Sequence, residues 1–279
     1  MRVFLALLLV TALAPASALE LRGEWRQGSV LFGHAEPGTR VWFNGRELKL
    51  TEGGEFVFGL DRDESAEAEL RVQAKGEPLP ETFRYQVKKR EYQIQHLTLP
   101  PTMVNPPAAV LARIREEQEQ VGEARRRVTG IAAFTGGFVW PCLGRISGVF
   151  GSQRILNGEP KQPHYGVDVA VPSGTPVRAP AGGVISLAHP DMYYTGGTLM
   201  IDHGHGLSSA FLHLSKLLVK SGDTVRQGDT IALSGATGRA TGPHLDWRVS
   251  WINARVDAAL LVPPMPEPEH EEEDDKEGS

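Results

Sequence analysis

The segment Pro243-His244-Leu245-Asp246-Trp247-Arg248-Val249 has the alternating polar and apolar pattern of a β-strand. In an extended chain alternate side chains share a face, so His244 and Asp246 project together, roughly 7 Å apart, while Leu245 points to the other face. One of the two polar groups can bind a metal ion while the other reaches a water on that ion. The segment therefore predicts a strand that carries a reactive polar site.

A second segment, His164-Tyr165-Gly166-Val167-Asp168, places a histidine and an aspartate four residues apart. On a straight strand these ends would lie about 13 Å apart, too far for one ion whose ligand bonds are about 2 Å long. Gly166 and the preceding Pro163 favour a bend, and the alternating valines that follow predict a strand leading inward. We expect the bend to bring His164 and Asp168 together.

The surrounding region, residues 138–262, consists of short apolar runs separated by glycine, with no long amphipathic helix. This pattern favours an antiparallel all-β domain. Two similar segments, Ser173–Arg178 and Ser221–Arg226, are each followed by a glycine and another apolar run. Paired hairpins of this kind occur in barrel-sandwich hybrid folds, so we expect a domain of that type.

Residues 19–95 alternate short apolar runs with turn signals, of which Asn44-Gly45 is the strongest hairpin signal. They predict an antiparallel β-sandwich that serves as an adaptor or spacer. Residues 96–137 form a predicted linker with a helix over 108–127, rich in Ala, Glu, Arg and Leu. Its apolar stripe at Val110, Leu111 and Ile114 is narrow, so we expect an exposed connector that lies against a neighbouring domain.

The two ends of the chain have distinct compositions. Residues 1–18 combine a charged start, the apolar stretch Val3–Leu13 and the small residues Ala16-Ser17-Ala18, as in a secretory signal peptide cleaved after Ala18. No later segment offers about 20 apolar residues, so we expect no transmembrane segment and a secreted, periplasmic protein. Residues 263–279 form a predicted disordered acidic tail.

Charge and cysteine content exclude several classes of protein. The net charge of -5 is dominated by the tail, and the rest of the chain is close to neutral, which gives no electrostatic basis for nucleic acid binding. Cys142 is the only cysteine, so an internal disulfide and a cysteine-based zinc site are excluded.

The remaining histidines fall into two groups, those that local structure explains and one that is a candidate site residue. His203 and His205 stand in the glycine-rich segment Asp202–Gly206, where turn geometry explains them better than metal binding. His213 follows an alternating strand, and alone it would be a packed residue. Together with the two segments described above, it becomes a candidate for stabilising a transition state, and the combination indicates a zinc hydrolase.

The second domain resembles the LytM/lysostaphin-type zinc metallopeptidases, which cut peptide bonds in bacterial peptidoglycan. The resemblance covers about Gly144–Asp257. It rests on several sequence segments that occur in the same order as in the family, not on a single motif. These segments are Gly144–Gly151, His164–Asp168, Val177–Ile185, Phe211–Ser215, Gly222–Gly228 and Thr237–Leu245.

The resemblance implies a Zn²⁺ site with His164 and Asp168 as ligands and Asp246 at the third ligand position. It also implies that His213 and His244 form the catalytic pair, which orients or deprotonates the water and stabilises the oxyanion. The family usually has His-x-His where this chain has His244-Leu245-Asp246. An aspartate oxygen can bind zinc at a similar distance, but a second anionic ligand reduces the acidifying effect of the metal on its water.

Two functions follow from this resemblance. The first is a secreted zinc-dependent endopeptidase that hydrolyses peptide bonds in peptidoglycan stem peptides or cross-links. The second is a catalytically weakened LytM-like domain that binds the cell wall or activates another murein hydrolase, with a cell-wall hydrolase or division protein as its partner. Four of the five site residues match the family pattern, which favours the enzyme. We further expect residues 138 onward to fold and act without the first domain.

Overall fold

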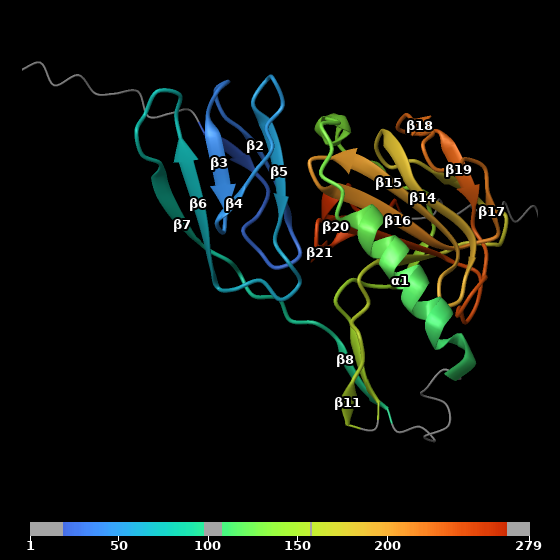
Figure 1. Cartoon of the computed structure of the whole chain (residues 1–279). Helices are drawn as coiled ribbons and strands as arrows, with labels where there is room; N and C mark the ends of the chain where they lie inside the picture. The colour runs from blue at the N-terminus through green and yellow to red at the C-terminus, as the bar shows by residue number, and fades with distance from the viewer. Residues whose placement is uncertain (1–18, 98–107, 157, 267–279) are drawn as a thin grey trace, which may run out of the picture.

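The computed structural model describes residues 19–97, 108–156 and 158–266, and Figure 1 shows their arrangement. The expected signal peptide and nearly all of the expected acidic tail lie outside these residues. No helix in the described ranges is long and apolar enough to cross a membrane. The described residues form mainly antiparallel sheets with one α-helix, which confirms the predicted mainly β fold class.

The N-terminal region forms two facing sheets. Phe43 in one sheet stacks on Phe58 in the other with ring centroids 4.4 Å apart, so the sheets share a core. Asn44 and Gly45 have φ values of 44° and 79°, as a two-residue hairpin turn requires. The first sheet has the order β1 (Glu20–Arg22), β2 (Val30–His34) and β5 (Glu55–Gly59), and the second β4 (Arg46–Glu47), β3 (Arg40–Phe43), β6 (Glu67–Gln73) and β7 (Glu81–Gln86).

The C-terminal region is built on an eight-stranded antiparallel sheet. Its order is β18 (Thr224–Val225), β14 (Gly183–Met192), β15 (Gly196–Gly204), β16 (Leu207–Leu214), β20 (Leu245–Trp251), β12 (Val167–Ala170) and β9 (Arg145–Gly148), with β21 (Ala254–Val256) also paired to β20. A smaller sheet has the order β13 (Pro176–Arg178), β19 (Thr230–Leu233) and β17 (Lys216–Leu217). Short 3-10 helices span Ala133–Gly136 and Ala258–Leu261.

The two faces of β20 have opposite character, as its alternating sequence predicts. Leu245 and Trp247 are fully buried on the face that packs into the hydrophobic core. Asp246 and Arg248 therefore lie on the opposite face. This second face, continued on β15 and β16, is the one on which the candidate site is built.

The helix α1 (Leu111–Arg125), preceded by a 3-10 turn at Ala108–Val110, agrees with the predicted helix over 108–127. It contacts β14 and β15 and crosses in front of the large sheet in Figure 1. Ile114 is buried against the sheet. The buried Glu117 accepts hydrogen bonds from Arg113 Nε at 2.6 Å and from the backbone N of Tyr193 at 2.8 Å. The connector is thus attached to the second domain, as its narrow apolar stripe predicts.

The strand β8 (Ile94–Leu97) links the two regions at an unexpected place. It pairs in parallel with β10 (Gln153–Leu156), which pairs with β11 (Glu159–Pro160). The predicted domain boundary at residue 95 falls inside this strand, whose four residues are too short to show a clear alternation. We propose that the first domain ends near residue 93.

The sandwich and the second region also share a packed interface. The buried Arg62 donates two hydrogen bonds to the Gly151 carbonyl, at 2.7 and 3.1 Å, and Arg90 pairs with Asp257 at 2.9 Å. A Cβ on Gly59 would lie 2.8 Å from Trp251 Cβ, so the backbones approach closely there. A truncation at Phe138 would expose Trp251 to water, which argues against fully independent folding of the second domain.

Candidate metal centre

The register of two strands brings the predicted carboxylates together. β12 pairs with β20 so that Asp168 lies directly opposite Asp246. His164 precedes β12, the chain bends at Gly166, and His164 Nε2 lies 3.2 Å from Asp168 Oδ1, which confirms the predicted bend. The ligand atoms of all three residues lie within 4.8 Å of one another, a spacing that one metal ion can bridge.

Two glycines leave room for these carboxylates. A Cβ on Gly166 would overlap Oδ1 of Asp246, and a Cβ on Gly148 would overlap Oδ2 of Asp168. Each carboxylate therefore occupies space that the Cβ of any other residue at Gly166 or Gly148 would fill. Gly166 has a second role beyond the bend, and its sequence context gave no sign of it.

The cluster contains polar atoms that a metal ion would satisfy. Among the described residues, His164 Nε2 and Asp168 Oδ1 are buried without a correctly aligned hydrogen-bond partner. Buried polar atoms are normally paired, because leaving one unpaired costs about 1–3 kcal/mol. Three protein ligands with a fourth position left open is the arrangement of catalytic zinc sites. The residues present fit such an ion.

Asp246 has a partner, Arg248, that is not among the predicted site residues. Arg248 Nε lies 3.0 and 3.1 Å from its two carboxylate oxygens, and Arg248 Nη2 lies 2.6 Å from Oδ2. Burial alone would raise the pKa of Asp246, but the charge and hydrogen bonds of Arg248 outweigh burial and hold that pKa below its ordinary value. The alternation that places His244 beside Asp246 also places Arg248 on the same face, so the signal was present at the next alternate position.

This ion pair changes the electrostatic argument about the ligand set. The guanidinium of Arg248 offsets the extra negative charge that Asp246 introduces where the family usually has histidine. His164, Asp168, Asp246 and Arg248 together carry the same net charge as two histidines and one aspartate. The loss of water acidity expected from a second anionic ligand is therefore reduced.

The two other candidate histidines lie beside the carboxylate cluster. The rings of His213 and His244 are 4.8 Å apart, and His244 Nε2 is 3.9 Å from Asp168 Oδ1. His213 has a φ of 62°, which interrupts the alternation of β16 and redirects its side chain out of the strand pattern. Burial lowers the pKa of His213 and keeps its ring neutral near pH 7.

The hydrogen bonds of both rings define their tautomers. His213 Nδ1 lies 2.8 Å from the Thr237 carbonyl, and His244 Nδ1 lies 2.8 Å from the Gly242 carbonyl. Because a carbonyl oxygen only accepts, each Nδ1 carries the proton in the neutral ring. Each Nε2 is then left with a lone pair that can accept a proton.

Comparison with known proteins gives the family. The model of peptidase family M23 matches residues 162–258. The crystal structure of a Pseudomonas aeruginosa protein named as a candidate M23 peptidase is 31% identical, covering 85% of this chain and 95% of that one with a TM-score of 0.67. The chain belongs to the M23 peptidase family. The resemblance to LytM-type enzymes is thereby confirmed.

Curated relatives match only part of this M23 chain. An uncharacterized metalloprotease of Haemophilus influenzae is 46% identical over 101 residues, which are 36% of this chain and 21% of the relative. Peptidoglycan DD-endopeptidase ShyA of Vibrio cholerae is 41% identical over 124 residues, 43% of this chain and 28% of the relative. The chain thus spans less than a third of the curated relatives it matches.

The other two histidines of this M23 chain have structural roles. His203 is fully buried in β15, not in a turn as expected, with Nδ1 2.6 Å from the Gly182 carbonyl and Nε2 2.8 Å from Ser209 Oγ. Burial lowers its pKa to about 4. His205 does lie in the turn after β15, with a φ of 50°. Neither belongs to the three-residue cluster that could hold a metal.

Proposed function

We propose that this chain is a zinc-dependent endopeptidase that hydrolyses peptide bonds in peptidoglycan. One zinc ion would be held by His164, Asp168 and Asp246. The observation that carries the proposal is the convergence of these three ligand atoms within 4.8 Å. Two of the atoms, His164 Nε2 and Asp168 Oδ1, are buried and lie 3.2 Å apart, but neither has an aligned hydrogen-bond partner among the described residues. Membership of the M23 family and the likeness to a protein named as a peptidoglycan DD-endopeptidase support the same substrate class.

When bound, zinc lowers the pKa of a coordinated water and polarises the scissile carbonyl. The side chains of this chain supply the proton transfers. Nε2 of His244 or His213 accepts the proton of the attacking water, because both Nδ1 atoms are occupied as donors. The protonated ring then hydrogen-bonds to the developing oxyanion and passes its proton to the leaving amine as the C–N bond breaks. Arg248 keeps Asp246 ionised and fixes its orientation.

Metal content and wall hydrolysis test this proposal together. The full mature chain is reconstituted with zinc, analysed for bound metal, and assayed for release of soluble fragments from purified peptidoglycan. We expect one zinc per chain and release of fragments that stops on chelation. Protein that folds but takes up no stoichiometric zinc would exclude the enzyme. We also propose that residues 1–18 direct export to the periplasm, where this substrate lies.

One observation favours the second function, a domain that binds the wall or activates another hydrolase without cutting. Both oxygens of Asp246 are engaged by Arg248, so this carboxylate has fewer free lone pairs for a metal than His164 or Asp168 offers. Binding of the zinc-free protein to insoluble peptidoglycan, without release of fragments after zinc is added, would support that function.

A further inference from the structure

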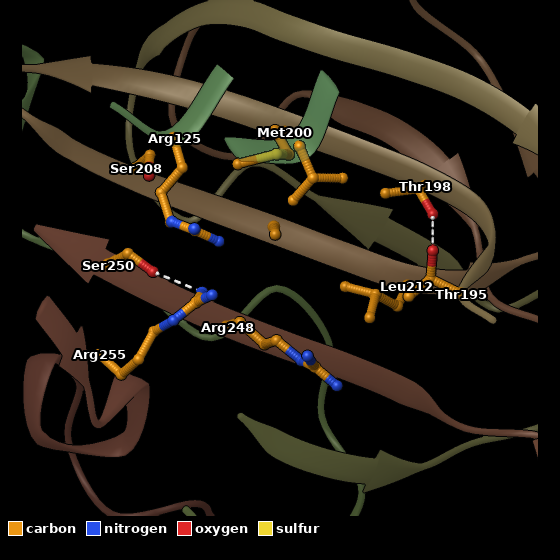
Figure 2. Close-up of a pocket in the computed structure, with 11 residues that line it drawn as sticks. Arg125, Thr195, Thr198, Met200, Ser208, Leu212, Arg248, Ser250 and Arg255 are labelled. Carbon is orange, nitrogen blue, oxygen red and sulfur yellow. Dashed lines mark hydrogen bonds between the residues drawn. The ribbon is translucent and has the colours of Figure 1, made fainter. Parts of the chain in front are cut away.

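A pocket lies on the same sheet face as the metal cluster, between the C-terminal part of α1 and strands β15, β16 and β20 (Figure 2). Arg248 and Ser250 of β20 line it, and these are the next residues after Asp246 on that face. Its space for water-sized groups is about 70 Å³, several times the roughly 10–15 Å³ that one water needs. The pocket therefore lies beside the candidate metal centre on one sheet face and can hold a small chemical group.

Three arginines from three separate segments line this pocket. Figure 2 shows Arg125 reaching toward Arg255, while the side chain of Arg248 points away from both. Only Arg248 has a carboxylate partner, since neither Arg125 nor Arg255 forms an ion pair with any described residue. Arg255 Nη1 donates instead to the hydroxyl of Ser250 at 3.2 Å.

The polar groups around the pocket are incompletely paired. Arg125 Nε and Ser208 Oγ are buried and have no hydrogen-bond partner among the described residues. Burial, together with the charges of Arg125 and Arg248, lowers the pKa of Arg255 to about 10. Clustered guanidinium groups remain costly to bury unless an anion neutralises them. The pocket thus has excess positive charge and free donors.

We propose that this pocket binds a carboxylate of a peptide, held between the guanidinium groups of Arg125 and Arg255. The planar fork of arginine matches the two oxygens of a carboxylate. Apolar walls formed by Val121, Met200 and Leu212 suit a short aliphatic side chain beside that group. The assignment rests on the proposed function, because it makes the pocket a specificity subsite for an acidic peptide substrate.

Binding is measured on the metal-free full chain, so hydrolysis plays no part. The probes are N-acetyl-alanyl-alanine in all-L and all-D forms, the matching C-terminal amides, and inorganic phosphate. By calorimetry we expect one acid form to bind and its amide to bind at least about tenfold more weakly, because a hydrogen bond to a charged group contributes at least that factor. Equal affinity of acid and amide would overturn the proposal. If phosphate binds as tightly as the acidic peptide, the pocket is a general anion site and the claim that it selects a peptide carboxylate is wrong.

Arginine variants locate the binding. Arg125→Met and Arg255→Met should each weaken the acid at least about tenfold, since each removes a charge-assisted contact. Arg126→Met is the matched control: it alters the neighbouring exposed arginine and should leave binding unchanged. Unaltered binding in Arg125→Met would assign the carboxylate to another place.

Thermal unfolding keeps the test decisive if a variant is unstable. The acidic peptide should raise the Tm of the wild-type protein but not that of Arg125→Met. If Arg125→Met does not fold, Arg125→Lys keeps the charge but loses the fork, and it should also bind more weakly. Zinc content is measured separately. A protein that takes up no zinc but still binds the acidic peptide would contradict the proposed function and leave the pocket assignment standing.

Discussion

The two halves of one sheet face carry opposite chemistry. At the β12 side, His164, Asp168 and Asp246 gather lone pairs and negative charge suited to a cation. Two residues further along β20, Arg248 joins Arg125 and Arg255 around a pocket suited to an anion. The Asp246–Arg248 pair lies at the border between them. Residues two apart on a strand share a face, so Asp246 and Arg248 place a cation site beside an anion site on β20. Their ion pair couples the charges of the two sites.

Breaking the border pair should have the largest effect. Asp246→Ala should abolish zinc binding and destabilise the fold by about 3–5 kcal/mol, because it leaves a largely buried guanidinium without its partner. Zinc content and urea unfolding of the metal-free protein measure the two losses separately. Unchanged zinc affinity in this variant would show that Asp246 serves only Arg248.

A double substitution sharpens the same comparison. Asp246→His restores the usual family ligand and should keep or raise hydrolysis, but alone it leaves Arg248 unpaired. Asp246→His combined with Arg248→Met should therefore be more stable than Asp246→His alone, with zinc retained. Additive effects of the two changes on the free energy of unfolding would show that the pair is not coupled.

The histidines beside the cation site should affect rate and not metal content. We expect His213→Ala and His244→Ala each to lower wall hydrolysis by on the order of 10²- to 10⁴-fold, as loss of a proton-transfer or oxyanion group does. Zinc content should stay at the wild-type value. Loss of zinc in either variant would assign that histidine to the ligand set.

The core face of the same sheet provides a contrast in pH dependence. His203 is neutral when folded, and its pKa falls from 6.5 to about 4 on burial. Between these values the unfolded chain binds more protons, so stability is lost as pH falls from about 6.5 to about 4, by on the order of 3 kcal/mol. Urea unfolding of the metal-free protein at several pH values measures this.

His203→Asn should remove most of that acid sensitivity, whereas His34→Asn, at an exposed position of β2, should leave it unchanged. The slope of stability against pH is the readout, so a lower overall stability of the variant does not affect the conclusion. An equal slope in His203→Asn and wild type would contradict the burial argument.

Local patterns predicted the parts of the site that depend on nearby residues. Alternation assigned Asp246 to the polar face of β20, and Gly166 indicated the bend that joins His164 to Asp168. The arginine pocket was not predictable in this way, because Arg125 and Arg255 come from a helix and a strand that are far apart in the sequence. The pairing of β8 with β10 was missed for a similar reason, since it links segments more than 50 residues apart.

The smallest expected effect concerns how α1 contributes to the anion site. Arg125 reaches the pocket from α1, and Glu117 attaches that helix through Arg113 and the Tyr193 backbone. Glu117→Gln keeps the shape but replaces a charged hydrogen bond with a neutral one, a loss of about 1 kcal/mol. If that loss is passed on to the position of Arg125, peptide affinity should fall by up to about fivefold. Zinc affinity should not change, because the three candidate ligands come from β20, β12 and the segment before β12.

Glu116→Gln, on the exposed side of the same helix, is the matched control. A parallel loss of zinc and peptide binding in Glu117→Gln would mean that the helix supports the whole face, and that the two halves are not separable.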